Sequence, residues 1–211
     1  KTLAYMRQLG GKIVWLPLAA GTDWFRNEQS LVYWVKQPDG KYSYDFRVFD
    51  RYLALVKKYL DPEEFCLYPA DISGPGDAPE YSLLDSATGA VKTETGPEYG
   101  TIPQAVAWWK PLIGAVVERL RKQGVGQERI MLGMDWEGPG YDWKGRTKAQ
   151  VFHAACPPGM KVVQIAHYGG KKESQGSTMP FPYGYTMAVF SDVEAKGYGN
   201  RNLPYRVLQH Y

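Results

Sequence analysis

Short apolar runs alternate with helical segments along this chain, and that alternation restricts its fold more than any other feature. Residues 13–19, 65–71 and 130–137 are mainly apolar and of strand length, which is typical of strands buried on both faces. The segments 46–60 and 101–123, which lie between them, have the features of helices. Strands that alternate with helices predict a parallel sheet with right-handed crossovers. We therefore expect an α/β fold in the form of a parallel (β/α) TIM-type barrel.

The predicted strands are too few to close such a barrel. Further strands are predicted at 161–168, 186–190 and 205–210, giving about six where a closed barrel has eight. The barrel is therefore either open or a fragment of a larger chain, with its first strands before Lys1. The sequence begins without Met, so the native N-terminus is expected to be missing. No repeat or linker divides residues 1–211, which predicts a single barrel domain.

Two connections between these elements are long and polar. Residues 27–44 contain a Pro38-Asp39-Gly40 turn, and residues 72–100 are rich in Gly, Pro, Ser, Thr and Asp. Both are predicted to be loops, the second irregular and lying over the same end of the sheet as Glu137. Loops of this length in compact domains tend to be functional or mobile.

Two acids, Asp135 and Glu137, end the strand at 130–137 and precede a Gly-Pro-Gly turn. Alternate residues of a strand share a face, so both acids should point the same way with Cα atoms roughly 7 Å apart. Neighbouring like charges separate the two pKa values, so one group can stay protonated while the other stays ionised. Glycosidases need this division of roles. An isolated Asp-x-Glu also fits a strand end whose acids are solvated or paired with Arg or Lys.

Other polar and aromatic residues follow the strands at the same end. Functional sites in parallel α/β folds collect at the carboxyl ends of the strands, and the opposite ends are plainer here. A tryptophan could stack on a sugar ring, while an acid could bind a hydroxyl or pair with a nearby Lys. The predicted substrate-binding residues are Trp24, Asp71, Trp143, His167, Tyr168 and Asp192.

Composition favours a carbohydrate substrate over the other classes of partner. The seven Trp and sixteen Tyr offer flat apolar faces with polar edges, which suit sugar rings, although large barrels also pack with aromatics. A net charge of +3 without basic runs argues against nucleic acid. No apolar segment approaches the ~20 residues that span a membrane, and no signal peptide is visible. The location stays open, a secreted or cell-surface setting being the favoured one, and the oligomeric state is unknown.

Neither a metal nor a cofactor is expected. The three histidines, at positions 153, 167 and 210, lack ligand spacing, and two cysteines are too few for a zinc site. No Gly-rich phosphate-binding motif follows any predicted strand.

Several segments resemble a known family of glycosidases. Residues 44–53, 84–89, 109–112 and 130–133 are similar to the barrel domain of glycoside hydrolase family 123. The resemblance implies retaining hydrolysis of N-acetylgalactosaminides, in which the substrate's own acetamido oxygen attacks the anomeric carbon. In that family an Asp orients the acetamido group and the adjacent Glu protonates the leaving oxygen. Here Trp136 separates the two acids, a departure from the family pattern.

The strand end at 133–140 also resembles the Asp-x-Asp-x-Glu motif of family 18 chitinases, with Gly133 in place of the first Asp. Both resemblances give Asp135 the acetamido-orienting role and Glu137 the acid role. The leading hypothesis is a substrate-assisted glycosidase acting on N-acetylhexosamine-containing glycans. The alternatives are a non-catalytic carbohydrate-binding or structural barrel domain, and a glycosidase with Asp71 or Asp192 as nucleophile about 5–5.5 Å from Glu137.

Overall fold

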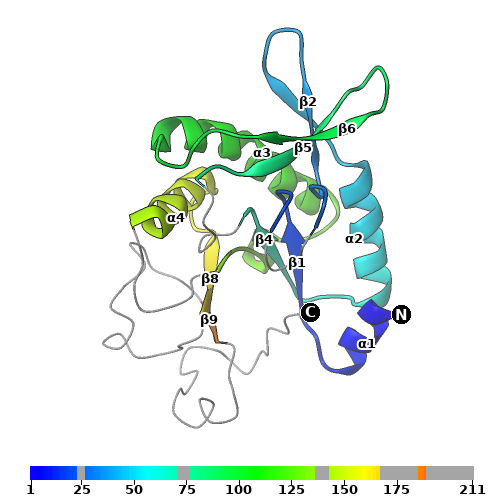
Figure 1. The fold of residues 1–211 in the computed structure, drawn as a ribbon. Coiled ribbons are helices and arrows are strands. Elements are labelled where there is room, and N and C mark those ends of the chain that lie inside the picture. Colours follow the sequence, from blue (N-terminus) through cyan, green and yellow to red (C-terminus); the bar gives the residue numbers. More distant parts are fainter. Residues whose placement is uncertain (23–26, 71–76, 136–142, 167–184, 189–211) are drawn as a thin grey trace.

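A computed structural model of the chain describes residues 1–22, 27–70, 77–135, 143–166 and 185–188 (Figure 1). For residues 134–135, 143–146, 162–166 and 185–188 it describes the main chain alone. Its larger sheet has five strands, in the order β1-β4-β7-β8-β9, and every neighbouring pair is parallel. The strands are β1 (Ile13–Pro17), β4 (Glu64–Tyr68), β7 (Ile130–Asp135), β8 (Lys161–Ala166) and β9 (Tyr185–Ala188). The predicted parallel sheet is confirmed.

Three helices connect successive strands of this sheet. They are α2 (Arg47–Tyr59), α3 (Ile102–Lys122) and α4 (Trp143–Ala155), while α1 (Thr2–Gln8) precedes β1 and a short 3-10 helix (Gln127–Arg129) precedes β7. The strands follow one another across the sheet in chain order, as in one arc of a (β/α) fold. The described residues form a mixed α/β fold, and no closed barrel is seen among them.

One face of the parallel sheet packs against the connecting helices. Alternate strand residues, such as Leu16, Leu67 and Leu132, share one buried cluster with side chains of all three helices, including Leu53, Val116 and Phe152. On the opposite face Trp15, Cys66, Tyr68 and Met131 are buried as well. Burial on both faces is the reason that these strands are recognisable as continuous apolar runs.

A second, smaller sheet is built from the connections that follow β1 and β4. Its order is β3-β2-β5-β6, with β2 (Tyr33–Lys36), β3 (Tyr42–Asp45), β5 (Glu80–Leu84) and β6 (Val91–Thr95). Two antiparallel hairpins join by a parallel pairing of Trp34 with Leu83. The predicted loops at 27–44 and 72–100 were therefore wrong where these strands lie. Strands of four or five residues, rich in polar and charged side chains, do not stand out from loops in composition.

Aromatic rings fix the small sheet to α3. The rings of Trp34 and Trp108 stack with centroids 4.9 Å apart, and Trp34 also meets Trp109 edge-on at 6.2 Å. Tyr81 of β5 lies 5.0 Å from Trp34, and Phe152 of α4 lies 5.2 Å from Trp109. Figure 1 shows β5 and β6 lying across α3. Because the ring pairs are offset, edge-on or tilted, they contribute beyond simple burial, by about 0.5–1.5 kcal/mol each.

Helix α3 runs unbroken through Pro111, although a proline inside a helix usually kinks or breaks it. Pro111 lies on the exposed side of the helix. The side chain of Arg119 donates from Nε to Oδ1 of Asp50 over 2.8 Å, which joins α3 to α2.

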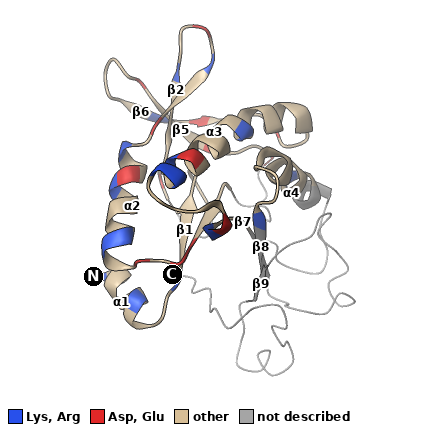
Figure 2. Cartoon of the chain, turned by 180° about the vertical axis from the view of Figure 1, so that it is seen from behind, with Lys and Arg blue, Asp and Glu red and all other residues tan. Residues whose placement is uncertain are grey.

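Acidic and basic residues are interspersed along these helices (Figure 2). Among the described helices, none combines the length and the apolar character needed to cross a membrane.

Candidate active site

The carboxyl ends of the parallel strands meet at one edge of the sheet. The register pairs Pro17 with Tyr68 and Leu67 with Leu132, and Asp135 with Ile165. Asp135 is the last residue of β7, the middle strand of the five. Parallel α/β folds place their sites at this edge. The connection after β4 leaves from the same edge, because β4 is the neighbour of β7.

The structure describes the main chain of two predicted site residues. They are Asp135 at the end of β7 and Trp143 at the first position of α4, the next described residue along the chain. The other predicted residues lie outside the described part of the chain: Glu137, Trp24, Asp71, His167, Tyr168 and Asp192. Their roles, like those of Asp135 and Trp143, stay predictions.

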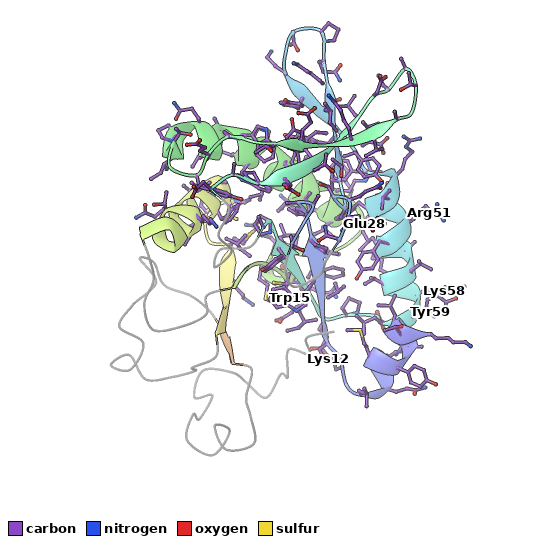
Figure 3. All side chains as sticks on the ribbon, in the orientation of Figure 1. Lys12, Trp15, Glu28, Arg51, Lys58 and Tyr59 are labelled. Atoms are coloured by element: carbon purple, nitrogen blue, oxygen red, sulfur yellow. The ribbon has the colours of Figure 1, made fainter. Side chains whose placement is uncertain are left out.

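Beneath the carboxyl ends, three buried side chains form what we call the floor: Trp15 of β1 with Cys66 and Tyr68 of β4. Trp15 and Cys66 are register partners, and the rings of Trp15 and Tyr68 meet edge-on with centroids 5.9 Å apart. Trp15 projects from β1 on the side away from α2 (Figure 3). The floor is therefore on the face of the sheet that the connecting helices do not cover.

Gly133 of β7 makes room for the floor. A Cβ atom at this position would lie 2.3 Å from Cζ3 of Trp15 and 2.5 Å from Sγ of Cys66, far inside contact distance. This explains the departure from the chitinase-like motif, because no side chain fits where that motif has its first Asp. Sequence reasoning selected neither Trp15 nor Tyr68. The signal was a bulky residue in β1 facing a glycine two strands away, which is visible only once the strands are paired.

The thiol of Cys66, which is part of the floor, is uncharged. Burial, with the negative charge of Glu64 adding to it, raises the pKa of the Cys66 thiol well above its ordinary value. The thiol thus stays protonated and is unsuited to nucleophilic attack or metal binding. No group of three His, Cys, Asp or Glu side chains able to hold a metal occurs within the described residues.

Comparisons with known proteins identify the family of this chain. A solved structure of a family 123 glycoside hydrolase from Clostridium perfringens, studied for its hydrolysis of glycolipid glycans, has a TM-score of 0.56 and 17% sequence identity. The match covers 80% of this chain but only 30% of that one, so it shows the shared fold alone. No curated protein matches. The family described as "Glycoside hydrolase 123, catalytic domain" matches residues 1–205. With nearly its whole length matched, this chain belongs to glycoside hydrolase family 123.

Proposed function

We propose that this chain is a glycosidase domain that cleaves N-acetylhexosamine-containing glycans with retention of configuration, by substrate-assisted catalysis. The observation that carries the proposal is the position of Asp135. It ends the middle strand of the parallel sheet in a family 123 catalytic domain, two residues before Glu137. The arc of five strands is then part of a (β/α) barrel, and residues 1–211 belong to that single domain.

The proposed reaction has two steps. In the first, the acetamido oxygen of the substrate attacks the anomeric carbon while the bond to the leaving oxygen breaks, and Glu137 gives its proton to that oxygen. Asp135 holds the acetamido N–H and stabilises the positive charge of the oxazolinium ion that forms. In the second step, the Glu137 carboxylate takes a proton from a water molecule as that water attacks the anomeric carbon. The bond from the anomeric carbon to the acetamido oxygen breaks, which opens the oxazolinium ring and restores the acetamido group. The two inversions give retention, and no enzymic nucleophile is used.

The sheet supports this assignment in two ways. Strand alternation predicts that Asp135 shares the face of Gly133, the face on which the floor lies. A sugar ring held by Asp135 would then lie above Trp15 and Tyr68, in surroundings of low polarity that strengthen charge interactions. Second, β7 lies between β4 and β8, so Asp71 follows one neighbouring strand while His167 and Tyr168 follow the other. We assign these residues, with Asp192, to sugar hydroxyl and acetamido contacts, and Trp24 and Trp143 to stacking.

Replacing each acid tests the mechanism. Glu137→Gln should lower turnover by the ~10²–10⁴ typical of lost acid catalysis, and less for aryl leaving groups that need little protonation. Asp135→Asn should slow good and poor leaving groups alike, because it acts on the attacking side. The rates are measured on aryl N-acetylhexosaminides of graded leaving-group pKa, with Glu118→Gln on the exposed side of α3 as the matched control.

Two results would contradict the mechanism. One is equal activity on aryl glycosides with and without the 2-acetamido group. The other is a measurable hydrolysis that neither substitution changes. Binding of N-acetylhexosamine glycans without any hydrolysis would favour a carbohydrate-binding role instead.

A further inference from the structure

We propose that the outer side of α1 and α2 is a docking surface for a membrane that carries anionic lipids. Among the side chains that the structure describes, every large apolar one that is exposed belongs to α1, to its C-terminal cap or to α2. These five residues, which we call the apolar patch, are 40–71% exposed: Tyr5, Leu9, Val48, Leu55 and Tyr59. Exposed apolar side chains that gather in one place mark interaction surfaces.

Three members of the apolar patch form one line along α2. Val48, Leu55 and Tyr59 are separated by seven and four residues, which places them on a single side of the helix. Asp50, which binds Arg119 of α3, lies on the opposite side. The residues of α2 that enter the core lie between these two sides. The line is therefore directed neither at the core nor at α3.

Helix α1 extends the patch beyond the end of α2. Tyr5 and Leu9 are four residues apart and are 63% and 71% exposed. Nη2 of Arg7 lies 3.9 Å from Oδ2 of Asp61, two residues after the end of α2, so the two helices meet there. Figure 1 shows α1 beside this end of α2, at the border of the molecule that is farthest from α4.

Cations border the apolar patch, with few acids beside them. Residues 1–12 contain three Lys or Arg and no acid, and residues 47–60 contain four and one acid, Asp50. Arg51 and Lys58 of α2 are exposed and form no ion pair within the described part of the chain. Nζ of Lys58 lies 5.1 Å from the centre of the Tyr59 ring. Figure 3 shows Arg51, Lys58 and Tyr59 projecting from α2 on the side away from β1.

This combination of groups matches the interface of a lipid bilayer. Leu and Tyr side chains can enter the boundary between headgroups and acyl chains, about 5–10 Å deep, while Lys and Arg stay at the level of the anionic headgroups. A second copy of the chain would bring Arg51 and Lys58 close to the same cations, and like charges in contact repel. The patch also follows the outer side of two helices, a shape that suits a flat surface.

Co-sedimentation with vesicles tests the proposal directly. The wild type should bind vesicles of phosphatidylcholine with about one third phosphatidylserine at least about tenfold more tightly than vesicles of phosphatidylcholine alone. Raising NaCl from about 0.1 M to about 1 M shortens the screening length from about 10 Å to about 3 Å, so it should release most of the bound protein.

Substitutions locate the surface. Arg51→Gln and Lys58→Gln should each lower the partition coefficient about fivefold, because each removes one cation near the anionic headgroups. Leu9→Ser and Leu55→Ser should each lower it by about three- to tenfold, because an apolar side chain no longer enters the bilayer. The matched control is Lys110→Gln, an exposed position of α3 outside this surface, which should stay within about twofold of the wild type. All these positions are exposed, and a urea midpoint equal to that of the wild type confirms folding.

Three results would overturn the proposal. They are equal binding to both kinds of vesicle, no binding to either, and a loss in Lys110→Gln as large as that in Arg51→Gln. Sedimentation velocity separates the remaining explanation: self-association that Leu55→Ser abolishes, in a protein that ignores vesicles, would assign the patch to contact between two copies. Hydrolysis of an aryl N-acetylhexosaminide should be the same in all variants. A wild type inactive on that substrate contradicts the proposed function, whereas vesicle binding decides the docking surface independently.

Discussion

The two sheets of this molecule are stabilised in different ways. The parallel sheet is packed on both faces, with helices on one and the floor on the other. The small sheet packs its aromatic face against α3, while Ser43, Thr93 and Thr95 of the other face are exposed. In the first sheet, the close approach of Gly133 to Trp15 and Cys66 leaves no room for a side chain at that position. The second depends on a few large rings, which pack on one of its faces.

Removing the central ring of the small sheet should have the largest effect on stability. Trp34→Ala deletes a fully buried indole that contacts four other rings, and should lower the free energy of unfolding by about 3–5 kcal/mol. Urea unfolding measures the loss, and hydrogen exchange should show β2, β3, β5 and β6 losing protection before β1, β4 and β7. Thr93→Ala on the exposed face is the control and should change stability by no more than about 0.5 kcal/mol. Equal loss of protection in both sheets would show that they are one cooperative unit.

Adding one methyl group to the parallel sheet should have the next largest effect. Gly133→Ala forces its Cβ into Trp15 and Cys66, and overpacking of this kind costs about 1–3 kcal/mol. Since the ring of Trp15 is the nearest obstacle, Trp15→Leu in the same chain should recover part of the loss. A double-mutant cycle measured by urea unfolding gives the coupling between the two positions. Strictly additive losses would mean that the floor does not depend on this close approach.

High pH should weaken the small sheet with the smallest effect of the three. Burial raises the pKa of Tyr44 to about 12 and moves the pKa of Tyr81 upward as well, the hydrogen bond with Tyr42 adding to burial there. A group whose pKa is raised on folding favours the folded state while it is protonated. That stability is complete below pH 10, the unfolded value, and is lost as the pH rises to about 12. Tyr44→Phe should therefore flatten the decline in Tm over this range. If Tm declines as steeply in Tyr44→Phe as in the wild type, the loss of stability comes from the titration of other groups.

The strands of the parallel sheet could be predicted from the sequence, whereas those of the small sheet could not. The strands β1, β4 and β7 were predicted because burial on both faces makes them continuous apolar runs. The small sheet was missed because its strands are short, and because Trp34 and Leu83 belong to different connections. Helix α1 was missed because it has only 7 residues and none of them is fully buried, so its apolar spacing is too short to mark a helix. In the site, the motif at Asp135 was visible, but the fit between Gly133 and Trp15 depends on pairing across three strands.

The division of the small sheet between two connections has a consequence for how the chain folds. Each hairpin is local and can close within about 1–10 μs. The hydrogen bonds between Ser30 and Ser82 join residues 52 positions apart, so joining the hairpins closes a long loop that contains α2 and β4 and is slower than closing either hairpin. On the ribosome, where synthesis runs from the N-terminus, all four strands of the small sheet are made before β7. The small sheet can therefore be assembled before the strand that carries Asp135 is inserted beside β4.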